Sequence, residues 1–171
     1  LHGSEICIAC NEDYVLINNV CEPLTTENLG QACSGQEFDL ILIMDGSGSV
    51  SSSDYSTAVT FMKDMVNYFE VSPTAARVTV LQFSNDVTIY GSPYESSAAN
   101  VQSNLDTLAN DQKSDNTYTH DAIYYAWQTS QNHGRQNVPQ MVILLTDGEA
   151  TDGVCPVEEK DRKSTRLNSS H

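Results

Sequence analysis

The chain has 171 residues, enough for one domain and a small appendage, and its formal net charge at pH 7 is −15. This charge argues against a nucleic-acid partner, because the phosphates would be repelled. The sequence has no uninterrupted run of about 18 apolar residues, so we predict no membrane contact for it.

Residues 1–35 form a cysteine-rich segment that ends in a linker of proline, glycine and polar residues. Four of the five cysteines lie between Cys7 and Cys33, a density typical of disulfide-bonded segments of extracellular proteins. A zinc site would need two close cysteine pairs. Cys7 and Cys10 form one such pair, but Cys21 and Cys33 are twelve residues apart, so the spacing disfavours zinc.

The globular part begins with the apolar run from Leu40 to Met44, which predicts a strand buried on both faces of a parallel sheet. The run ends in Asp45, Ser47 and Ser49, which alternate with glycines that let the backbone turn. One carboxylate and two hydroxyls form a ligand set of oxygens alone, which suits Mg²⁺ or Ca²⁺ and is poor for zinc. We therefore predict a site for a hard cation at this point of the chain.

The residues that follow alternate between helix and strand patterns. The expected elements are a helix at 51–70 with a capping box at Ser51 and Asp54, a hairpin of strands 77–83 and 87–90, helices through 101–108 and 122–127, and a buried strand at 141–145. The aromatic residues Tyr124, Tyr125 and Trp127 have helical spacing and are expected to pack in or beside the core.

This order of elements predicts an α/β fold with a doubly wound, mostly parallel sheet. Right-handed crossovers would place the strand at 141–145 beside the strand that ends at Asp45, with the hairpin on the other side. The chain then leaves the two neighbouring strands in opposite directions, and ligands bind outside the carboxyl ends of such strands. Asp45 and Asp147, which follow these strands, are therefore expected to meet there.

Three motifs in the chain resemble the metal-ion-dependent adhesion site of von Willebrand factor type A domains, the group that includes integrin inserted domains. They are Asp45-x-Ser47-x-Ser49, a threonine loop with Thr117, and Thr-Asp147-Gly, in the order found in the family. The likeness covers about 38–153 and implies that 36–160 is a partial type A domain. It also implies that the three hydroxyls bind the metal directly and that the two aspartates act directly or through water.

The resemblance further implies a metal, Mg²⁺ or else Mn²⁺ or Ca²⁺, with one open position that a partner protein fills with an Asp or Glu side chain. The expected function is adhesion or protein binding outside the cell, with a matrix or cell-surface protein as ligand. The net charge of −15 would repel an acidic ligand, but salt screens that repulsion beyond about 8 Å. At contact distance the dication dominates.

Two other functions are consistent with parts of the pattern. A structural matrix module with a vestigial metal site would carry the same motifs without binding a partner through a metal. A Mg²⁺-dependent phosphatase of the haloacid-dehalogenase type needs a second acid where this chain has Ser47, which cannot act as a general acid near neutral pH. We therefore predict that the chain is not an enzyme.

The two ends of the chain carry resemblances of their own. Cys10-x-x-x-Tyr14 followed by Cys21 is similar to the last loop of epidermal-growth-factor-like repeats, which implies a Cys10–Cys21 disulfide. Residues 161–171 resemble a translated sequencing adapter and are expected to be foreign to the protein. A complete type A domain continues beyond the strand at 141–145, so the domain is expected to be truncated at its C-terminus.

The fifth cysteine, Cys155, follows the strand at 141–145, whereas Cys33 precedes the first strand of the domain. A strand of seven residues separates these two ends of the sheet by roughly 23 Å. A disulfide requires Cα atoms within about 7 Å of each other, so we predict no bond between Cys33 and Cys155. Their partners stay open.

Overall fold

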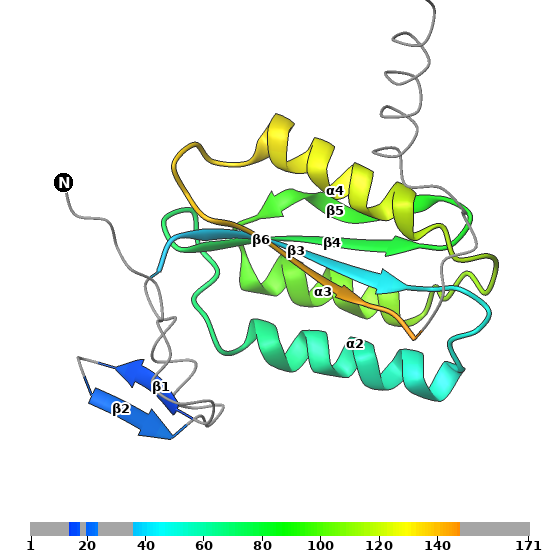
Figure 1. Cartoon of the computed structure of the whole chain (residues 1–171), viewed down its shortest axis with the longest axis horizontal. Helices are drawn as coiled ribbons and strands as arrows, with labels where there is room; N and C mark the ends of the chain where they lie inside the picture. Colours follow the sequence, from blue (N-terminus) through cyan, green and yellow to red (C-terminus); the bar gives the residue numbers. More distant parts are fainter. Residues whose placement is uncertain (1–13, 18–19, 24–35, 148–171) are drawn as a thin grey trace, which may run out of the picture.

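The computed structural model describes residues 14–17, 20–23 and 36–147 (Figure 1). In chain order the elements are β1 (Tyr14–Ile17), β2 (Val20–Pro23), β3 (Phe38–Asp45), α2 (Ser52–Val66), β4 (Ala76–Phe83), β5 (Val87–Glu95), α3 (Ala98–Ala109), α4 (Thr119–His133) and β6 (Gln140–Leu145). In the part of the chain that is described, no helix is long and apolar enough to cross a bilayer.

The strands β1 and β2 form an antiparallel hairpin within the cysteine-rich segment, with Leu16 opposite Cys21. The sequence reading did not anticipate this hairpin. The other four cysteines lie outside the described residues, and so do the linker, the proposed disulfide and the segment 161–171. The predictions for these parts of the chain stay predictions.

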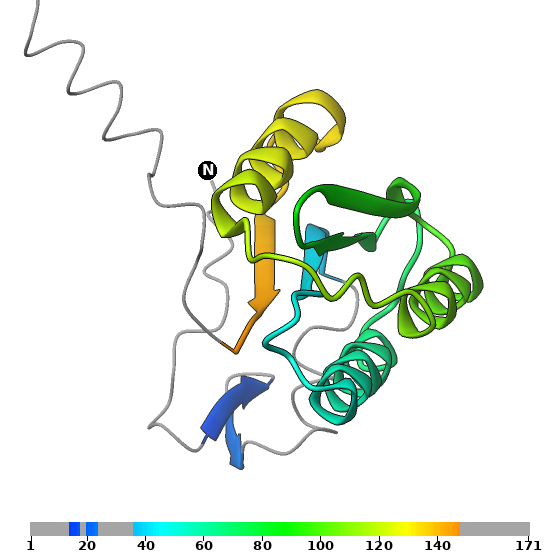
Figure 2. The same ribbon diagram turned by 90° about the vertical axis from the view of Figure 1, so that its right-hand side faces the viewer.

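The main sheet has the strand order β5-β4-β3-β6, in which β3 runs parallel to both neighbours and β5 is antiparallel to β4. Helices α2 and α3 cover one face of the sheet and α4 covers the other (Figures 1 and 2). This three-layer α/β architecture confirms the predicted fold class. It also confirms that β3 lies between the hairpin strands and β6.

Strand β3 is the centre of the core, and all eight of its residues are buried. Its side chains alternate between two apolar clusters, as the pleat of a strand requires. Leu40, Leu42 and Met44 pack against α2 and α3, whereas Ile41 and Ile43 pack on the side of α4. A continuous apolar run is therefore the pattern of a strand that is covered on both faces.

The first helix begins as predicted, because the Ser51 Oγ accepts a hydrogen bond from the Asp54 N–H at 3.1 Å. It ends at Val66 rather than at residue 70. The turn after Val66 is tighter than an α-helical turn, because the N–H of Asn67 bonds to the carbonyl of Asp64, three residues earlier. Such short bonds are common where an α-helix ends.

Strand β5 is longer than predicted, because it continues past Tyr90 to Glu95. The sequence Gly-Ser-Pro at 91–93 resembles a strand terminator. In the structure Gly91 adopts a φ of 80°, and the register against β4 shifts between Val78 and Val80. A bulge on an edge strand accommodates a proline that a central strand would not tolerate.

The prediction for the aromatic residues of α4 is wrong for Trp127 and Tyr124, which are 56% and 48% exposed. The helix packs on the sheet through the small side chains of Ala122 and Ala126 instead. Periodicity located the helix, but the alanines take the inner face because they allow a close approach to the sheet. Only Tyr125 of the three packs partly against the core.

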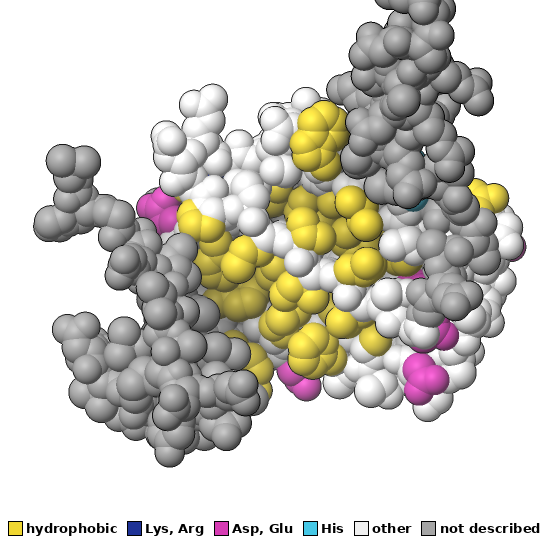
Figure 3. Space-filling model, viewed as in Figure 1, with side chains coloured by type: hydrophobic (Ala, Val, Ile, Leu, Met, Phe, Trp, Pro, Cys, Tyr) yellow, Lys and Arg dark blue, Asp and Glu magenta, His cyan; other side chains and the backbone are white. Residues whose placement is uncertain are grey.

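Apolar side chains gather over β6, between α4 and α2 (Figure 3). Within the described residues β6 is an edge strand, and its Met141 and Val142 side chains are 42% and 52% exposed. The exposed Ile123 and Trp127 side chains of α4 line the same hollow as these two residues. This side of the sheet is therefore the least covered part of the domain.

Candidate metal centre

The carboxyl ends of β3 and β6 lie side by side, because Met44 is in register with Leu145. Asp45 is the last residue of β3, and Asp147 follows two residues after the end of β6. The Thr146 hydroxyl donates a hydrogen bond of 2.6 Å to the Asp45 Oδ2 and ties the two strand ends together. The predicted meeting of these ends is thus present in the structure.

The loop after β3 brings four of the five predicted ligands into one continuous row. The Ser47 N–H donates to the Asp45 Oδ1 at 2.9 Å, and the hydroxyls of Ser47 and Ser49 lie 3.0 Å apart. The Ser49 hydroxyl then donates to the Asp147 Oδ1 at 3.1 Å. Residues from two separate loops, 98 positions apart, are therefore in direct contact.

The fifth predicted residue, Thr117, is 4% exposed and lies in the loop between α3 and α4 (residues 110–118). The loop itself is bonded to the loop after β3, through Ser114 N–H to the Gly46 carbonyl at 2.7 Å and Gly48 N–H to the Asp115 carbonyl at 2.8 Å. Figure 2 shows both loops in front of the strands, seen from the end of the sheet.

The glycines of this site serve close packing rather than an unusual backbone turn. Among the described glycines only Gly91 has a positive φ. A Cβ atom on Gly46 would overlap the Gln82 side chain, and one on Gly48 would lie 3.0 Å from the Ser114 carbonyl oxygen. The expectation that the glycines permit a sharp turn is therefore replaced by a requirement for space.

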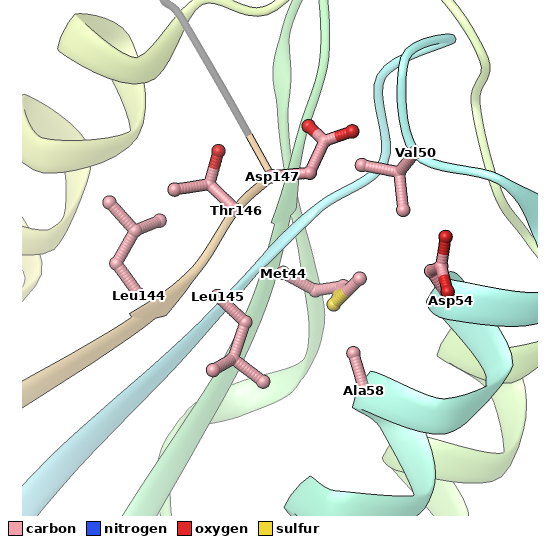
Figure 4. Close-up of a pocket in the computed structure, with 8 residues that line it drawn as sticks. All are labelled: Met44, Val50, Asp54, Ala58, Leu144, Leu145, Thr146 and Asp147. Carbon is pink, nitrogen blue, oxygen red and sulfur yellow. The ribbon is translucent and has the colours of Figure 1, made fainter.

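The site has a buried floor and an open rim. Asp45 and Ser47 are fully buried, whereas Ser49 and Asp147 are exposed. Beside the rim is a cavity of about 270 Å³ between β6 and the start of α2 (Figure 4). In that view Asp147 faces the loop that carries Val50, and the Thr146 side chain points the opposite way.

The electrostatics of the floor are unusual for a buried carboxylate. The groups bonded to Asp45 are a backbone N–H and a neutral hydroxyl. None of the ion pairs within 36–147 involves Asp45. A buried carboxylate normally has a cationic partner, because its desolvation is costly.

A metal at this place would depend on hydroxyls as much as on acids. Within the described residues, no three His, Cys, Asp or Glu side chains come together as a metal cluster. Two carboxylates, the serine hydroxyls and a threonine hydroxyl are all hard oxygen donors, so their chemistry suits a hard dication. Sequence reasoning missed the part played by Thr146, whose place directly before Asp147 was the available signal.

Comparisons with known proteins identify the family. A family model described as "von Willebrand factor type A domain" matches residues 39–169. Curated relatives include the mouse collagen alpha-4(VI) chain, 31% identical over 148 residues, and mouse matrilin-2, 29% identical over 147 residues. These alignments cover 82% and 81% of this chain but only 6% and 15% of the relatives, so the chain matches a small part of each.

Solved structures with the same fold are more distant in sequence. One is proximal thread matrix protein 1 from the mussel byssus, with a zinc-occupied MIDAS motif, at 23% identity and a TM-score of 0.61. Another is the manganese-loaded TRAP protein of Plasmodium vivax, at 20% identity and a TM-score of 0.63. Each comparison covers 77% of this chain, with 34% and 54% of the respective neighbours.

The family match spans well over half of the chain, and the relatives are proteins of the extracellular matrix. These findings favour the adhesion reading over a purely structural module. The chain belongs to the von Willebrand factor type A domain family, as a domain of an extracellular protein.

Proposed function

We propose that the site at the carboxyl ends of β3 and β6 binds one divalent cation and, through it, an acidic side chain of a partner protein. Asp45, Ser47, Ser49, Thr117 and Asp147 would hold the ion, with Mg²⁺ as the first candidate and Mn²⁺ or Ca²⁺ as alternatives. The partner would be a matrix or cell-surface protein.

The observation that carries this proposal is the environment of Asp45. Its carboxylate is fully buried, and within 36–147 it has neutral hydrogen-bond donors but no ion-pair partner. A dication above Ser47 and Ser49 would supply the missing positive charge. The metal-bearing structural neighbours, which carry zinc or manganese in their own chains, support a divalent ion of this general kind.

The division between floor and rim supports the part played by the partner. Asp45 and Ser47 are shielded from solvent, whereas Ser49 and Asp147 face outward. A metal held between them would have protein oxygens below it and solvent above it. Two carboxylates at most balance the charge of a dication, and they balance less of it when an aspartate acts through a water molecule. An acidic side chain of the partner can then replace the water on the solvent side of the ion.

The first experiment measures the thermal stability of the full chain in EDTA and in Mg²⁺, Mn²⁺ or Ca²⁺. We expect Mg²⁺ or Mn²⁺ to raise the unfolding temperature of the wild type, since a ligand present at 100 times its Kd stabilises the folded state by about 2.7 kcal/mol. Thr117→Ala should remove most of this gain, measured for the variant as the difference between its unfolding temperatures in metal and in EDTA. Thr107→Ala, an exposed helix position, is the matched control.

The second experiment probes the open coordination position with a small carboxylate. N-acetyl-glutamate amide should bind in the presence of Mg²⁺ and not in EDTA, whereas N-acetyl-glutamine amide should bind in neither. If the wild type shows no response to any of the three metals, the metal-centred function is wrong. A response to metal without carboxylate binding would restrict the proposal to the metal alone.

A further inference from the structure

Two buried polar side chains near the end of β4 are not part of the ligand set. Gln82 is 0% exposed and Ser84, just beyond the strand, is 1% exposed. Gln82 lies on the face of the sheet that also carries Val78 and Val80, and Ser84 follows two residues later, in the turn after the strand. A buried amide or hydroxyl in such a place is costly unless it is hydrogen-bonded, so its partners are informative.

Gln82, at the end of β4, forms hydrogen bonds with the loop between α3 and α4. Its Nε2 donates to the Asp111 carbonyl at 2.8 Å and to the Tyr90 hydroxyl at 2.6 Å. Its Oε1 accepts from the Lys113 N–H at 3.2 Å. Both ends of the amide are therefore used, and two of the three bonds fix the backbone of this loop.

Ser84 bonds to the same loop on both sides of Thr117. Its hydroxyl donates to the Asn116 carbonyl at 3.0 Å and accepts from the Asp115 N–H at 3.1 Å. Its backbone carbonyl accepts from the Tyr118 N–H at 3.0 Å. The residues directly before and after Thr117 are thus attached to one serine.

The same glutamine also contacts the loop after β3. Gly46 packs so closely on Gln82 that a Cβ at that position would overlap the glutamine side chain. The Gly46 carbonyl in turn accepts the Ser114 N–H of the α3–α4 loop. Gln82 therefore lies between the two loops that carry three hydroxyl ligands of the proposed metal centre.

A second attachment strengthens this arrangement. The Tyr90 hydroxyl, which accepts from Gln82, donates to the Asp111 Oδ2 at 2.7 Å, and the Lys113 ammonium donates to the same oxygen at 2.7 Å. Burial and the neighbouring Asp111 carboxylate raise the pKa of Tyr90, so its hydroxyl stays a neutral donor. The loop is fixed in these contacts by protein groups alone.

We propose that Gln82 and Ser84 are positioning residues that fix Thr117 relative to the Asp45–Ser49 loop before any metal binds. This inference rests on the metal-binding function proposed above. Ligands held by a surrounding shell of hydrogen bonds bind a metal more tightly, because the loop does not have to be ordered during binding. Removing either residue would shift that ordering cost onto the binding step.

The test compares two variants with a control on the same strand. Gln82→Met keeps the length of the side chain and removes its hydrogen bonds, and Ser84→Ala removes one hydroxyl. Thr79→Val is the control, because Thr79 is also fully buried on β4 and its hydroxyl accepts a bond, from the Tyr94 N–H at 2.8 Å, far from the metal loops. All three changes remove buried hydrogen bonds.

The first readout is the Kd for Mg²⁺ of the full chain, measured by titration calorimetry at a temperature where each variant is fully folded. Changes in the surroundings of metal ligands typically cost about 10- to 100-fold in affinity, so we expect a loss of that size for Gln82→Met and Ser84→Ala. Thr79→Val should bind Mg²⁺ like the wild type. An unchanged Kd in both β4-end variants would overturn the inference, even if both were less stable.

The second readout does not involve metal. In EDTA, the amides of Lys113 and Asp115 should exchange with solvent more than tenfold faster in the variant that removes each acceptor, Gln82→Met and Ser84→Ala respectively. Amides of β3 should not change. If the wild type binds none of Mg²⁺, Mn²⁺ and Ca²⁺, the proposed function is wrong, and unchanged exchange in both variants would separately refute the positioning role. Should Gln82→Met fail to fold, the smaller change Ser84→Ala decides both readouts.

Discussion

The two ends of β3 each carry a buried aspartate, and the two carboxylates differ in whether cationic side chains bond to them. Asp39, near the start of the strand, accepts paired hydrogen bonds from Arg77 at 2.9 and 2.7 Å. Arg135 adds two more, from its Nε at 2.9 Å and its backbone N–H at 2.7 Å. Asp45, at the end of the strand, has neutral donors alone among the described residues.

Under the proposed function, this difference separates a carboxylate that the fold neutralises from one that is kept for a ligand. A buried charge that the fold itself neutralises contributes to holding the fold together, and removing one partner leaves the others unpaired. A buried charge without a protein cation raises the free energy of the fold until a cation arrives. Asp39 belongs to the first class, and the proposed metal site would put Asp45 in the second.

The substitution Asp39→Asn is predicted to have the largest effect on the free energy of unfolding. Both Asp39 oxygens accept from N–H groups, so an amide in that place would direct its own N–H groups at Arg77, Arg135 or Gln140. We expect the free energy of unfolding to fall by about 3–5 kcal/mol, equally in EDTA and in Mg²⁺. Urea unfolding followed by circular dichroism measures this change.

The matched control is Glu37→Gln, because Glu37 also pairs with Arg135 but is exposed and 3.9 Å away. That change should cost less than about 1 kcal/mol, as for other exposed ion pairs. Equal losses for the two substitutions would mean that burial does not distinguish these acids.

The sequence was sufficient to predict that Asp45 and Asp147 meet at one end of β3, but not the cluster around Asp39 at the other end. Asp45 and Asp147 each follow an apolar strand, so local pattern and topology locate them. Asp39 reads as an ordinary strand position, because Arg77 and Arg135 are 38 and 96 residues away and no motif joins them.

Packing details were also beyond the sequence. The exposed Trp127 and the buried Ala126 each belong to a row of apolar residues with helical spacing, so periodicity cannot tell which row faces the sheet. The short distance between α4 and the sheet decides in favour of the smaller side chain. The buried Gln82 interrupts the apolar face of β4, and that break was a signal in the sequence. Its meaning depends on a loop some thirty residues further on, which bonds to it at Asp111 and Lys113.

A smaller loss in the free energy of unfolding is expected when the pH is lowered. Burial alone would raise the pKa of Asp39, but the hydrogen bonds from Arg77, the Arg135 backbone and Gln140 lower it from 3.8 to about 2. A lowered pKa means that the stabilisation is complete above about pH 4 and is lost as the pH falls through 2. Between about pH 5 and pH 2 this group should lose about 2 kcal/mol.

The measurement compares the wild type with Asp39→Asn across that pH range. Because the variant lacks the titrating carboxylate, the gap in free energy of unfolding between the two proteins should narrow by the same amount as the pH falls. A constant gap would show that Asp39 does not titrate with a depressed pKa, and the description of its neutralising partners would need revision.

The smallest effect on the metal-free protein is expected at the other aspartate. In Asp45→Asn the side-chain oxygen can still accept from the Ser47 N–H, and the new amide N–H can donate to the Thr146 hydroxyl oxygen, which now becomes the acceptor. Both bonds survive and a buried charge disappears. In EDTA we therefore expect the free energy of unfolding to stay within about 1 kcal/mol of the wild type.

The same variant should lose all stabilisation by Mg²⁺, so the two conditions separate the roles of the two aspartates. Urea unfolding in EDTA and in excess Mg²⁺ gives both values from one protein preparation. A loss of about 3 kcal/mol or more in EDTA would place Asp45 with Asp39, as a carboxylate that the fold needs in its charged form. The contrast between the two ends of β3 would then carry no information about a ligand.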